Sequence, residues 1–466
     1  MLDRRRFAAA LPLVLFLALP LFAAPPPQGV NIYPAHPSNR TGIEFGIQTD
    51  CPVGTQSVSR TGSLITVVFS STHLCDPPFN TEIKIPYPGL LEPGTYQLQV
   101  VTDIGQEPYA TAAFVVRDAA ADAFFAAPFA IPDQDPSWVR LVPNGSTPFC
   151  PEGACIVRFN GVAALAKKVD PTGNLWVIPP SHAGDAYVDV SIVGNSSTQT
   201  VQSAVYYFDR GAPANLTVFE RVLFPVLVST RGGHGSDWRS EAVISNPNDW
   251  YEETFNNIIP IICVTSPCGE RLEPGQQVKF SGEGFPHGVA LLVPRAEAPL
   301  MAFSLRVRDV SRQADSFGTS IPVVRENQFF RGTITLLDVP VDPAFRSKLR
   351  VYGFGRPEYY PPLQARVTTV NPITHAKTSV NVPVEPTGCG PECAPEAPYY
   401  AELDLPAGAA GERVDVYVNI LVDPDFDVPP MRSWAFVSVT NNKTQEVTTV
   451  IPDGTGGEPC SPCAHP

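Results

Sequence analysis

Proline restricts the fold of this chain more than any other feature: 52 of its 466 residues are proline, and 34 are glycine. A proline inside an α-helix removes a backbone hydrogen bond and costs about 3 kcal/mol. Prolines recur along the whole sequence, so they leave little room for long helices. Strands joined by turns accept proline and glycine at their edges and in the turns. We therefore predict an all-β protein.

Alternating apolar and polar residues mark several strands. Tyr96, Leu98 and Val100 share one face of a predicted strand, and glutamines lie between them. The turn before it, residues 91–94, reads Leu-Glu-Pro-Gly, in which proline and glycine favour a tight reversal. The same alternation recurs in AYVDVSIVG, residues 186–194. A period of two indicates strands with one face against a core.

The chain is several times longer than a typical domain of about 100–150 residues. We predict tandem immunoglobulin-like β-sandwich domains with local disulfides. The expected divisions are an export signal (1–23), four β-sandwiches (28–117, 137–209, 218–324 and 325–453) and a flexible tail (454–466).

Residues 137–209 contain three motifs that resemble a known family. They are FNGVAA (159–164), LWVIPPSHAGDAYVDVSIV (175–193) and AVYYF (204–208). They are similar to the strand and turn motifs of the IPT/TIG module, an immunoglobulin-like repeat of exported bacterial proteins. The family's glycine-rich opening strand is replaced here by WVRLVPNGSTPF. The resemblance implies an immunoglobulin-like sandwich in an exported protein.

The third and fourth predicted sandwiches show a weak internal repeat. Their landmarks follow the same order, which is better evidence than any single match. The alternative is chance similarity between two proline-rich β sequences. The first match pairs Trp238-Arg239-Ser240-Glu241 with Phe345-Arg346-Ser347-Lys348. The second pairs the turn at 272–275 with the turn at 405–408, together with the strands that follow them, VKF and RVDVYV. The last two pair Ala302-Phe303 with Ala435-Phe436 and Ile321-Pro322 with Ile451-Pro452.

The N-terminal residues have the pattern of an export signal. Arg4–Arg6 precede an apolar run over Phe7–Phe22, and Ala23 and Ala24 follow. A retained membrane anchor is the alternative, although the run is shorter than the roughly 20 residues of a spanning helix. The arginines fit both the general and the twin-arginine export routes. We expect an exported protein of the periplasm, the cell surface or the extracellular space, with no membrane span after the signal.

Ten cysteines fall into close pairs, which in an exported chain indicates disulfides. Zinc is the alternative, but it requires two pairs brought together, and these pairs are far apart. Asp423, Asp425 and Asp427 are interpreted as a solvated loop, with calcium as the alternative. We predict no metal and no cofactor. The expected bridges are Cys51–Cys75, Cys150–Cys155, Cys263–Cys268, Cys389–Cys393 and Cys460–Cys463.

The loop RGGHGSDWRSEAVISNP, residues 231–247, contains the strongest candidate for catalysis. It places His234, Ser236, Asp237 and Arg239 close together. A hydrolase nucleophile elbow requires a second glycine and a following helix, whereas this serine is followed by a predicted strand. We therefore predict a structural loop whose tryptophan fills a core, and no catalytic residue. A glycan or ester hydrolase with a site near 231–241 is the alternative.

The net charge of −14 argues against nucleic acid and anionic membrane surfaces as partners. We predict a non-enzymatic binding or structural protein, acting in adhesion, scaffolding or partner binding at the bacterial envelope. Its partner is expected to be protein or carbohydrate. Aromatic doublets near prolines are the predicted contact residues, with ordinary packing at strand ends as the alternative. They are Trp250-Tyr251, Tyr359-Tyr360 and Tyr399-Tyr400.

Overall fold

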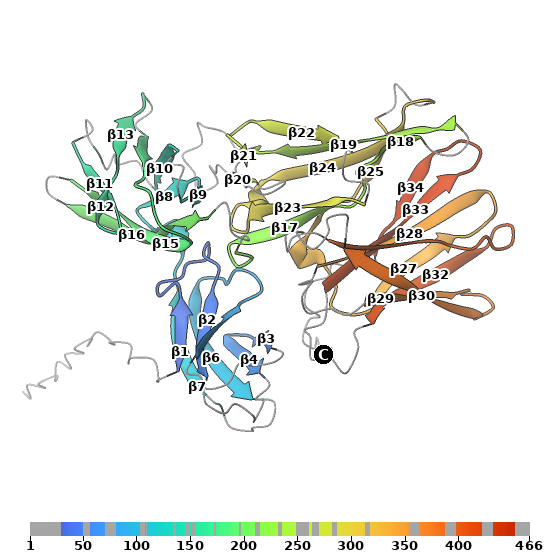
Figure 1. Cartoon of the computed structure of the whole chain (residues 1–466), viewed down its shortest axis with the longest axis horizontal. Helices are drawn as coiled ribbons and strands as arrows, with labels where there is room; N and C mark the ends of the chain where they lie inside the picture. Colours follow the sequence, from blue (N-terminus) through green and yellow to red (C-terminus); the bar gives the residue numbers. More distant parts are fainter. Residues whose placement is uncertain are drawn as a thin grey trace, which may run out of the picture.

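The described part of the chain is built from β-strands (Figure 1). It contains no α-helix, and none of its helices is long and apolar enough to cross a membrane. The short 3₁₀ helices are η1 (Ala119–Ala121), η4 (Ala298–Leu300) and η5 (Glu326–Gln328). The predicted all-β class is confirmed. The computed structural model describes residues 29–49, 56–69, 81–102, 108, 110–133, 137–144, 150, 154–171, 174–194, 197–209, 215–231, 235–247, 261–262, 270–281, 287–312, 317–354, 363–386, 398–421 and 432–452.

The N-terminal unit, drawn in blue to cyan in Figure 1, packs two sheets against each other. Their strand orders are β1-β2-β5 and β3-β4-β6-β7. Tyr96, Leu98 and Val100 are buried in the core between them, as their alternation predicts. The strands are β1 (Val30–Tyr33), β2 (Glu44–Thr49), β3 (Gln56–Thr61), β4 (Leu64–Phe69), β5 (Thr81–Pro86), β6 (Gly94–Thr102) and β7 (Ala110–Val116).

The second unit has an immunoglobulin-like topology. Its sheets have the orders β13-β14-β10-β8 and β12-β11-β15-β16-β9, with β9 parallel to β16. When β8 and β9 are taken as the two halves of strand A, the sheets correspond to ABED and to GFC with one added strand. The strands are β8 (Phe124–Ala127), β9 (Ala130–Pro132), β10 (Val139–Pro143), β11 (Ile156–Phe159), β12 (Val162–Ala163), β13 (Ala166–Val169), β14 (Leu175–Ile178), β15 (Ala186–Val193) and β16 (Thr198–Phe208).

Cys150 and Cys155 form a disulfide, and both are buried in the core of the second unit. The other four predicted pairs lie outside the described residues. We expect peptide mapping without reduction to recover five local bridges, because an oxidising compartment favours disulfides between nearby cysteines. The Cys150–Cys155 bridge serves as the internal control. Peptides joined between distant units would contradict local pairing.

The third unit is centred on β19, which pairs with β18 and β22 along one edge and with β24 along the other. A separate sheet has the order β23-β17-β26. The strands are β17 (Phe219–Phe224), β18 (Ser229–Arg231), β19 (Asp237–Ser245), β20 (Ile261–Ile262), β21 (Glu270–Arg271), β22 (Gln277–Ser281), β23 (Val289–Pro294), β24 (Ala302–Asp309), β25 (Thr319–Ile321) and β26 (Val324–Arg325).

The C-terminal unit is one sheet folded over itself, with the order β27-β32-β29-β30-β31-β28-β33-β34. β30 pairs with β29 along most of its length and with β31 only at Glu385 and Pro386. The two halves enclose a common core. The strands are β27 (Ile334–Pro340), β28 (Phe345–Phe354), β29 (Leu363–Val370), β30 (Lys377–Pro386), β31 (Tyr399–Asp404), β32 (Arg413–Leu421), β33 (Arg432–Asn441) and β34 (Val447–Val450).

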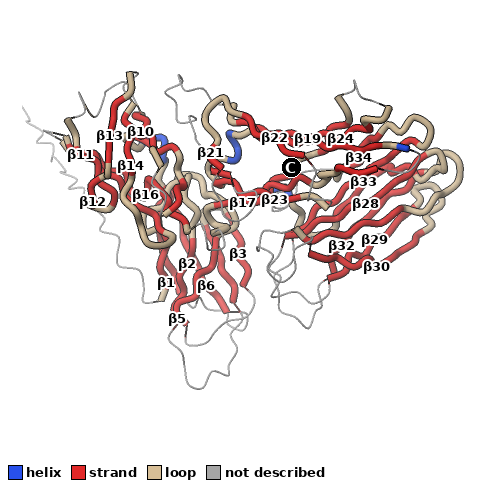
Figure 2. Tube along the Cα trace, turned by 45° about the horizontal axis from the view of Figure 1, so that its top comes forward, coloured by secondary structure: helices blue, strands red, loops and turns tan. Residues whose placement is uncertain are grey.

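The third and C-terminal units lie side by side in both views (Figures 1 and 2) and share buried residues. Tyr352 and Trp434 of the C-terminal unit belong to the same buried cluster as Phe224 and Leu305 of the third unit. The Tyr352 hydroxyl donates a hydrogen bond to the carbonyl of Pro225. The predicted boundary between residues 324 and 325 therefore separates strands that share one core. The division into domains remains a proposal.

The strands that begin with the two matched motifs have comparable places in their sheets. β19 and β28 are both central strands, and Ser240 pairs with Val307 as Ser347 pairs with Val439. This register differs by one residue from the sequence match of Ala302-Phe303 with Ala435-Phe436. The match of the two turns is wrong, because VKF lies in β22 beside the central strand, whereas RVDVYV lies in β32 in the other half of its sheet.

Candidate functional site

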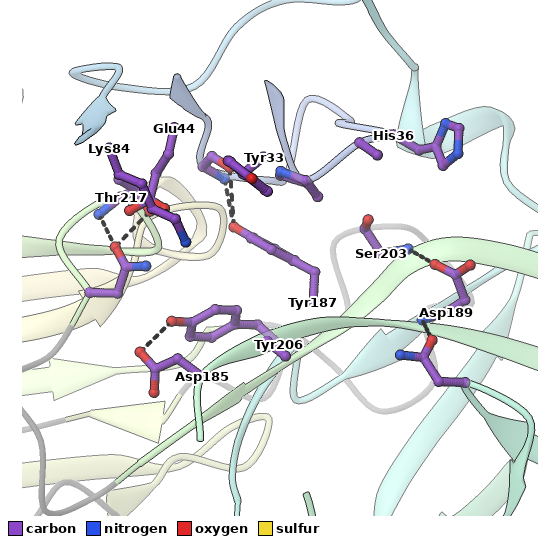
Figure 3. Close-up of a pocket in the computed structure, with 16 residues that line it drawn as sticks. Tyr33, His36, Glu44, Lys84, Asp185, Tyr187, Asp189, Ser203, Tyr206 and Thr217 are labelled. Carbon is purple, nitrogen blue, oxygen red and sulfur yellow. Dashed lines mark hydrogen bonds and ion pairs between the residues drawn. The ribbon is translucent and has the colours of Figure 1, made fainter. Parts of the chain in front are cut away.

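A cleft of about 440 Å³ opens where the N-terminal and second units meet. We call it the junction cleft. Figure 3 shows Tyr187 extending from the second unit towards Tyr33 of the N-terminal unit, while Tyr206 lies beside Asp185. Residues Asn215 and Thr217, which precede β17, close one side. The remaining lining residues are Pro34, Ala35, His36, Gly42, Glu44, Lys84, Asn160, Ala186, Asp189 and Ser203.

Tyr33 and Tyr187 supply the aromatic surface of the junction cleft, and Tyr206, which is 2 % exposed, packs against Tyr187. The ring centroids of Tyr187 and Tyr206 are 4.9 Å apart, and the rings are tilted by 56°. Tyr33 lies at the end of β1, and its hydroxyl donates to Glu82 at 3.0 Å. The Lys84 ammonium lies 4.7 Å from the Tyr33 ring centroid. The rings are held by both units and are therefore preformed for contact with a ligand.

The tyrosine hydroxyls are held by hydrogen bonds. Tyr187 Oη accepts from the backbone N–H of Gly42 at 2.9 Å. Tyr206 Oη donates to Asp185 Oδ2 at 2.7 Å. Burial, as the largest cause, raises the pKa of Tyr187 and of Tyr206. Both hydroxyls therefore stay protonated at neutral pH and keep the two rings in fixed positions.

Acidic and amide groups surround the rings. Burial raises the pKa of Glu44, and Lys84 and Asn215 oppose that shift. The Lys84 ammonium is 4.0 Å from the Glu44 carboxylate. Asp189 accepts from the backbone N–H of Ser203 at 2.8 Å. Carboxylates, an ammonium and amides together provide both acceptors and donors for a polar ligand.

Gly42 allows the close approach that forms the junction cleft. A Cβ atom at this position would lie 2.1 Å from the carbonyl oxygen of Thr217. The same residue donates to Tyr187, so the loop after β1 touches both the second unit and the start of β17. A side chain here would push the units apart.

The structure separates the predicted aromatic doublet at 399–400. Tyr399 is 5 % exposed and packs in the core of the C-terminal unit. Neighbouring residues of a strand face opposite sides, so Tyr400 faces away from that core and packs against the core shared with the third unit. Tyr400 is half-buried, stacks on His287 with ring centroids 4.6 Å apart, and donates to Glu402 at 2.5 Å. The doublets Trp250-Tyr251 and Tyr359-Tyr360 lie outside the described residues, so their role stays a prediction.

The described residues of the loop at 231–241 lead directly into β19. Ser236 is 2 % exposed, so its hydroxyl is closed to a substrate. The Asp237 backbone N–H donates to Asp309 at 2.9 Å, and the Arg239 guanidinium pairs with the Asp237 carboxylate at 3.1 Å. Trp238 packs against the core shared by the third and C-terminal units. His234 lies outside the described residues.

None of the tyrosines that line the junction cleft was predicted from the sequence as a contact residue. Tyr33 is followed by proline but is not part of a doublet, and Tyr206 lies in AVYYF, a pattern that indicates a strand. Each residue comes from a different segment, and the cleft exists only because two units meet. Among the described residues, no three His, Cys, Asp or Glu side chains are grouped as a metal site.

Comparison with known proteins identifies no family for this chain. No family model matches it, and no curated protein matches it. Two of the solved structures that resemble it weakly are described here. One is SGBP-B from a complex xyloglucan utilization locus in Bacteroides uniformis, with 11 % identity, a TM-score of 0.15, and coverage of 84 % of this chain and 98 % of that protein. The other is a crystal structure with a xylogluco-oligosaccharide, with 8 % identity, a TM-score of 0.17, and coverage of 84 % and 96 %. Scores this low assign neither an arrangement of domains nor a ligand to this chain.

Proposed function

We propose that this chain is an exported, non-enzymatic binding protein of the bacterial envelope, with a carbohydrate as its ligand. The junction cleft, lined by Tyr33, Tyr187 and Tyr206 and surrounded by carboxylates and amides, is the observation that carries the proposal. The resemblance of residues 137–209 to an IPT/TIG module and the N-terminal export pattern support the envelope location. Adhesion or scaffolding would follow from holding a surface glycan.

The chemistry of the cleft favours sugar over other ligands. A pyranose has apolar C–H faces that pack on tyrosine rings, and hydroxyls that both donate and accept hydrogen bonds. Glu44, Asp185 and Asp189 place acidic side chains around the cleft, against the single cation of Lys84. This balance disfavours phosphate-bearing ligands such as nucleic acid. A neutral oligosaccharide is the best match.

Binding without turnover is favoured over hydrolysis. The serine of the alternative site, Ser236, is buried. In the junction cleft, the Asp185 carboxylate is engaged by the Tyr206 hydroxyl and by the backbone N–H of Asp209 at 2.8 Å. Both oxygens of this carboxylate are therefore occupied by hydrogen bonds within the protein.

The glycan proposal is tested by calorimetric titration of the mature protein with a panel of neutral oligosaccharides. Tyr33→Ala is expected to lower the affinity for the oligosaccharide about tenfold, because it removes one stacking ring from the cleft. Tyr417→Ala, at a half-buried position of β32 in the C-terminal unit, is the matched control and is expected to leave affinity unchanged. Equal losses in both variants, or no sugar bound by the wild type, would overturn the proposal.

The same titrations test the enzymatic alternative. The oligosaccharides are recovered afterwards and assayed for new reducing ends, which the proposal expects to be absent. If hydrolysis appears and is lost in Ser236→Ala together with His234→Ala, the loop at 231–241 is its site. Hydrolysis that survives both changes removes that loop from the mechanism.

A further inference from the structure

A second cavity of about 560 Å³ lies between the third and C-terminal units. We call it the inter-unit groove. Trp238, at the start of β19, and Phe345, at the start of β28, both line it. These aromatics occupy matched positions of the predicted repeat, but Phe345 lies on the face of β28 that packs against the core of the C-terminal unit. The proposed function leaves this groove without a role.

The wall that the third unit contributes to the inter-unit groove is largely apolar, whereas the wall of the C-terminal unit mixes apolar, charged and hydroxyl side chains. The third unit contributes Val228, Val307 and Ile321 beside its tryptophan. The C-terminal unit contributes Leu405 and Phe436 beside its phenylalanine. A volume between about 300 and 1,000 Å³ with apolar walls and a few polar groups is typical of sites for small ligands. The groove therefore suits a small apolar group better than a flat protein surface.

The cations of the groove come from one face of β28. Arg346, Lys348 and Arg350 alternate with the buried residues Ser347, Leu349 and Val351 of the opposite face. Further along the same strand, the groove face continues as Tyr352 and Phe354, which enter the shared core. Against three cations the groove lining holds one carboxylate, Asp404. A locally basic lining is notable in a chain with a net charge of −14.

The three cations differ in how far they are already neutralised. The Lys348 ammonium is 3.1 Å from Glu402 and 3.5 Å from Asp404. The Arg350 guanidinium donates to Ser438 at 2.7 Å and lies 5.8 Å from the ring centroid of Phe436. Arg346 donates to the neutral amide of Gln445 at 2.7 Å, and no carboxylate of the described residues lies within ion-pair distance of it. Arg346 is also exposed, so it is the cation available to an anion.

The walls of the groove are fixed to each other. The Thr319 hydroxyl of β25 donates to the carbonyl of Val447 in β34 at 2.6 Å. The shared core joins the same units beyond it. A ligand would thus meet a formed groove and lose little affinity to rearrangement of the protein.

We propose that the inter-unit groove binds a single-chain amphiphile with an anionic head group. The apolar chain lies against Trp238 and the neighbouring apolar side chains of the third unit, and the anion pairs with Arg346. The site is independent of the junction cleft and of any sugar bound there. A carboxylate and a sulfonate share the required chemistry, so both serve as probes.

The probes are 8-anilinonaphthalene-1-sulfonate and dodecanoate, applied to the mature protein below the micellar concentration of dodecanoate. The sulfonate is expected to bind saturably with enhanced fluorescence, and dodecanoate is expected to displace it. Dodecanol, which lacks the charge, is expected to displace it at least tenfold less effectively. Failure of dodecanoate to compete would overturn the proposal. Displacement by acidic peptides alone would overturn it in favour of a protein partner.

Two variants locate the site. Arg346→Gln is expected to lower the affinity for dodecanoate about tenfold. Arg366→Gln, at an exposed position of β29 away from the groove, is the control and is expected to leave that affinity unchanged. Trp238→Phe is expected to abolish the change in tryptophan emission on binding, while Trp176→Phe in the second unit keeps it. Unchanged dodecanoate affinity in Arg346→Gln, or an unchanged emission response in Trp238→Phe, would place the ligand elsewhere. Oligosaccharide binding is measured on the same samples, so failure here is distinct from failure of the proposed function.

Discussion

Replacing Glu326 by glutamine is expected to lower the free energy of unfolding of the third unit by about 3 kcal/mol at pH 7. Glu326 Oε1 accepts from the Arg221 guanidinium at 2.6 Å, and Oε2 accepts from the Arg221 backbone N–H at 3.1 Å. Arg295 adds a second cation at 3.8 Å. Arg221 is itself buried, with its guanidinium 4.3 Å from the ring centroid of Phe354. Glutamine keeps the shape but leaves a buried arginine without its anion.

The sign of the pH dependence follows from the pKa of Glu326. Burial alone would raise that pKa, but Arg221 and Arg295 lower it to about 2. A carboxyl whose pKa is depressed on folding stabilises the fold above its unfolded pKa and loses that contribution as pH falls. The loss for Glu326 therefore runs from about pH 4.5 down to about pH 2, and it amounts to about 3 kcal/mol.

Urea unfolding followed by circular dichroism at pH 7 and pH 3 measures this effect. The difference between Glu326→Gln and wild type is expected to shrink at pH 3. Glu385→Gln, an exposed position of β30, is the control and is expected to change stability by less than about 0.5 kcal/mol. An equal difference at both pH values would show that the loss comes from packing rather than charge.

The sequence was sufficient to predict the strands, because their signal is local. Alternation over Tyr96, Leu98 and Val100 identified the buried face of β6 without any tertiary information. The parallel pairing of β4 with β6, and of β9 with β16, has no such signal, since it depends on segments distant in sequence. The register of the predicted repeat was likewise fixed only by the pairing partners of β19 and β28.

The sites were harder to predict because both arise between units. The even-numbered residues of β28 share one face, with arginines at its start and Tyr352 towards its end. The sequence alone does not show that the third unit covers the part of this face that carries Tyr352. Tyr399 and Tyr400 were predicted to form one contact surface because they are adjacent aromatic residues. In a strand, however, adjacent residues face opposite sides. Tyr33 and Tyr187 are separated by most of two units, and no local pattern connects them.

Glu297→Gln is expected to remove a fall in stability that wild-type protein shows between about pH 4.5 and pH 7. Glu297 is fully buried, and its carboxylate lies 3.6 Å from the guanidinium of Arg40, which is 8 % exposed. Phe129 donates its backbone N–H to Glu297 Oε1 at 3.4 Å, and its ring centroid lies 5.2 Å from the same guanidinium. The N-terminal, second and third units thus meet at one buried ion pair.

Burial is the largest influence on Glu297 and raises its pKa to about 7, although Arg40 acts in the opposite direction. A carboxyl whose pKa is raised on folding contributes stability below its unfolded pKa and loses it as pH rises through the folded pKa. The expected loss for wild type between pH 4.5 and 7 is about 3 kcal/mol. Glutamine does not titrate, so the variant gains that amount relative to wild type as pH rises from 4.5 to 8.

Hydrogen exchange of peptides over β8 and β9, corrected for the intrinsic pH dependence of exchange, reports the opening of this junction. Wild type is expected to lose protection between pH 5 and pH 8, and Glu297→Gln is expected to keep it. Glu241→Gln, whose carboxylate is exposed and 3.5 Å from Lys279, is the control and should follow wild type. If the variant lost protection in parallel with wild type, a group other than Glu297 would control the junction. The junction cleft is built from the N-terminal and second units, which also meet at Glu297. Opening at Glu297 is therefore expected to weaken oligosaccharide binding by the wild type above pH 7, whereas Glu297→Gln is expected to keep its affinity.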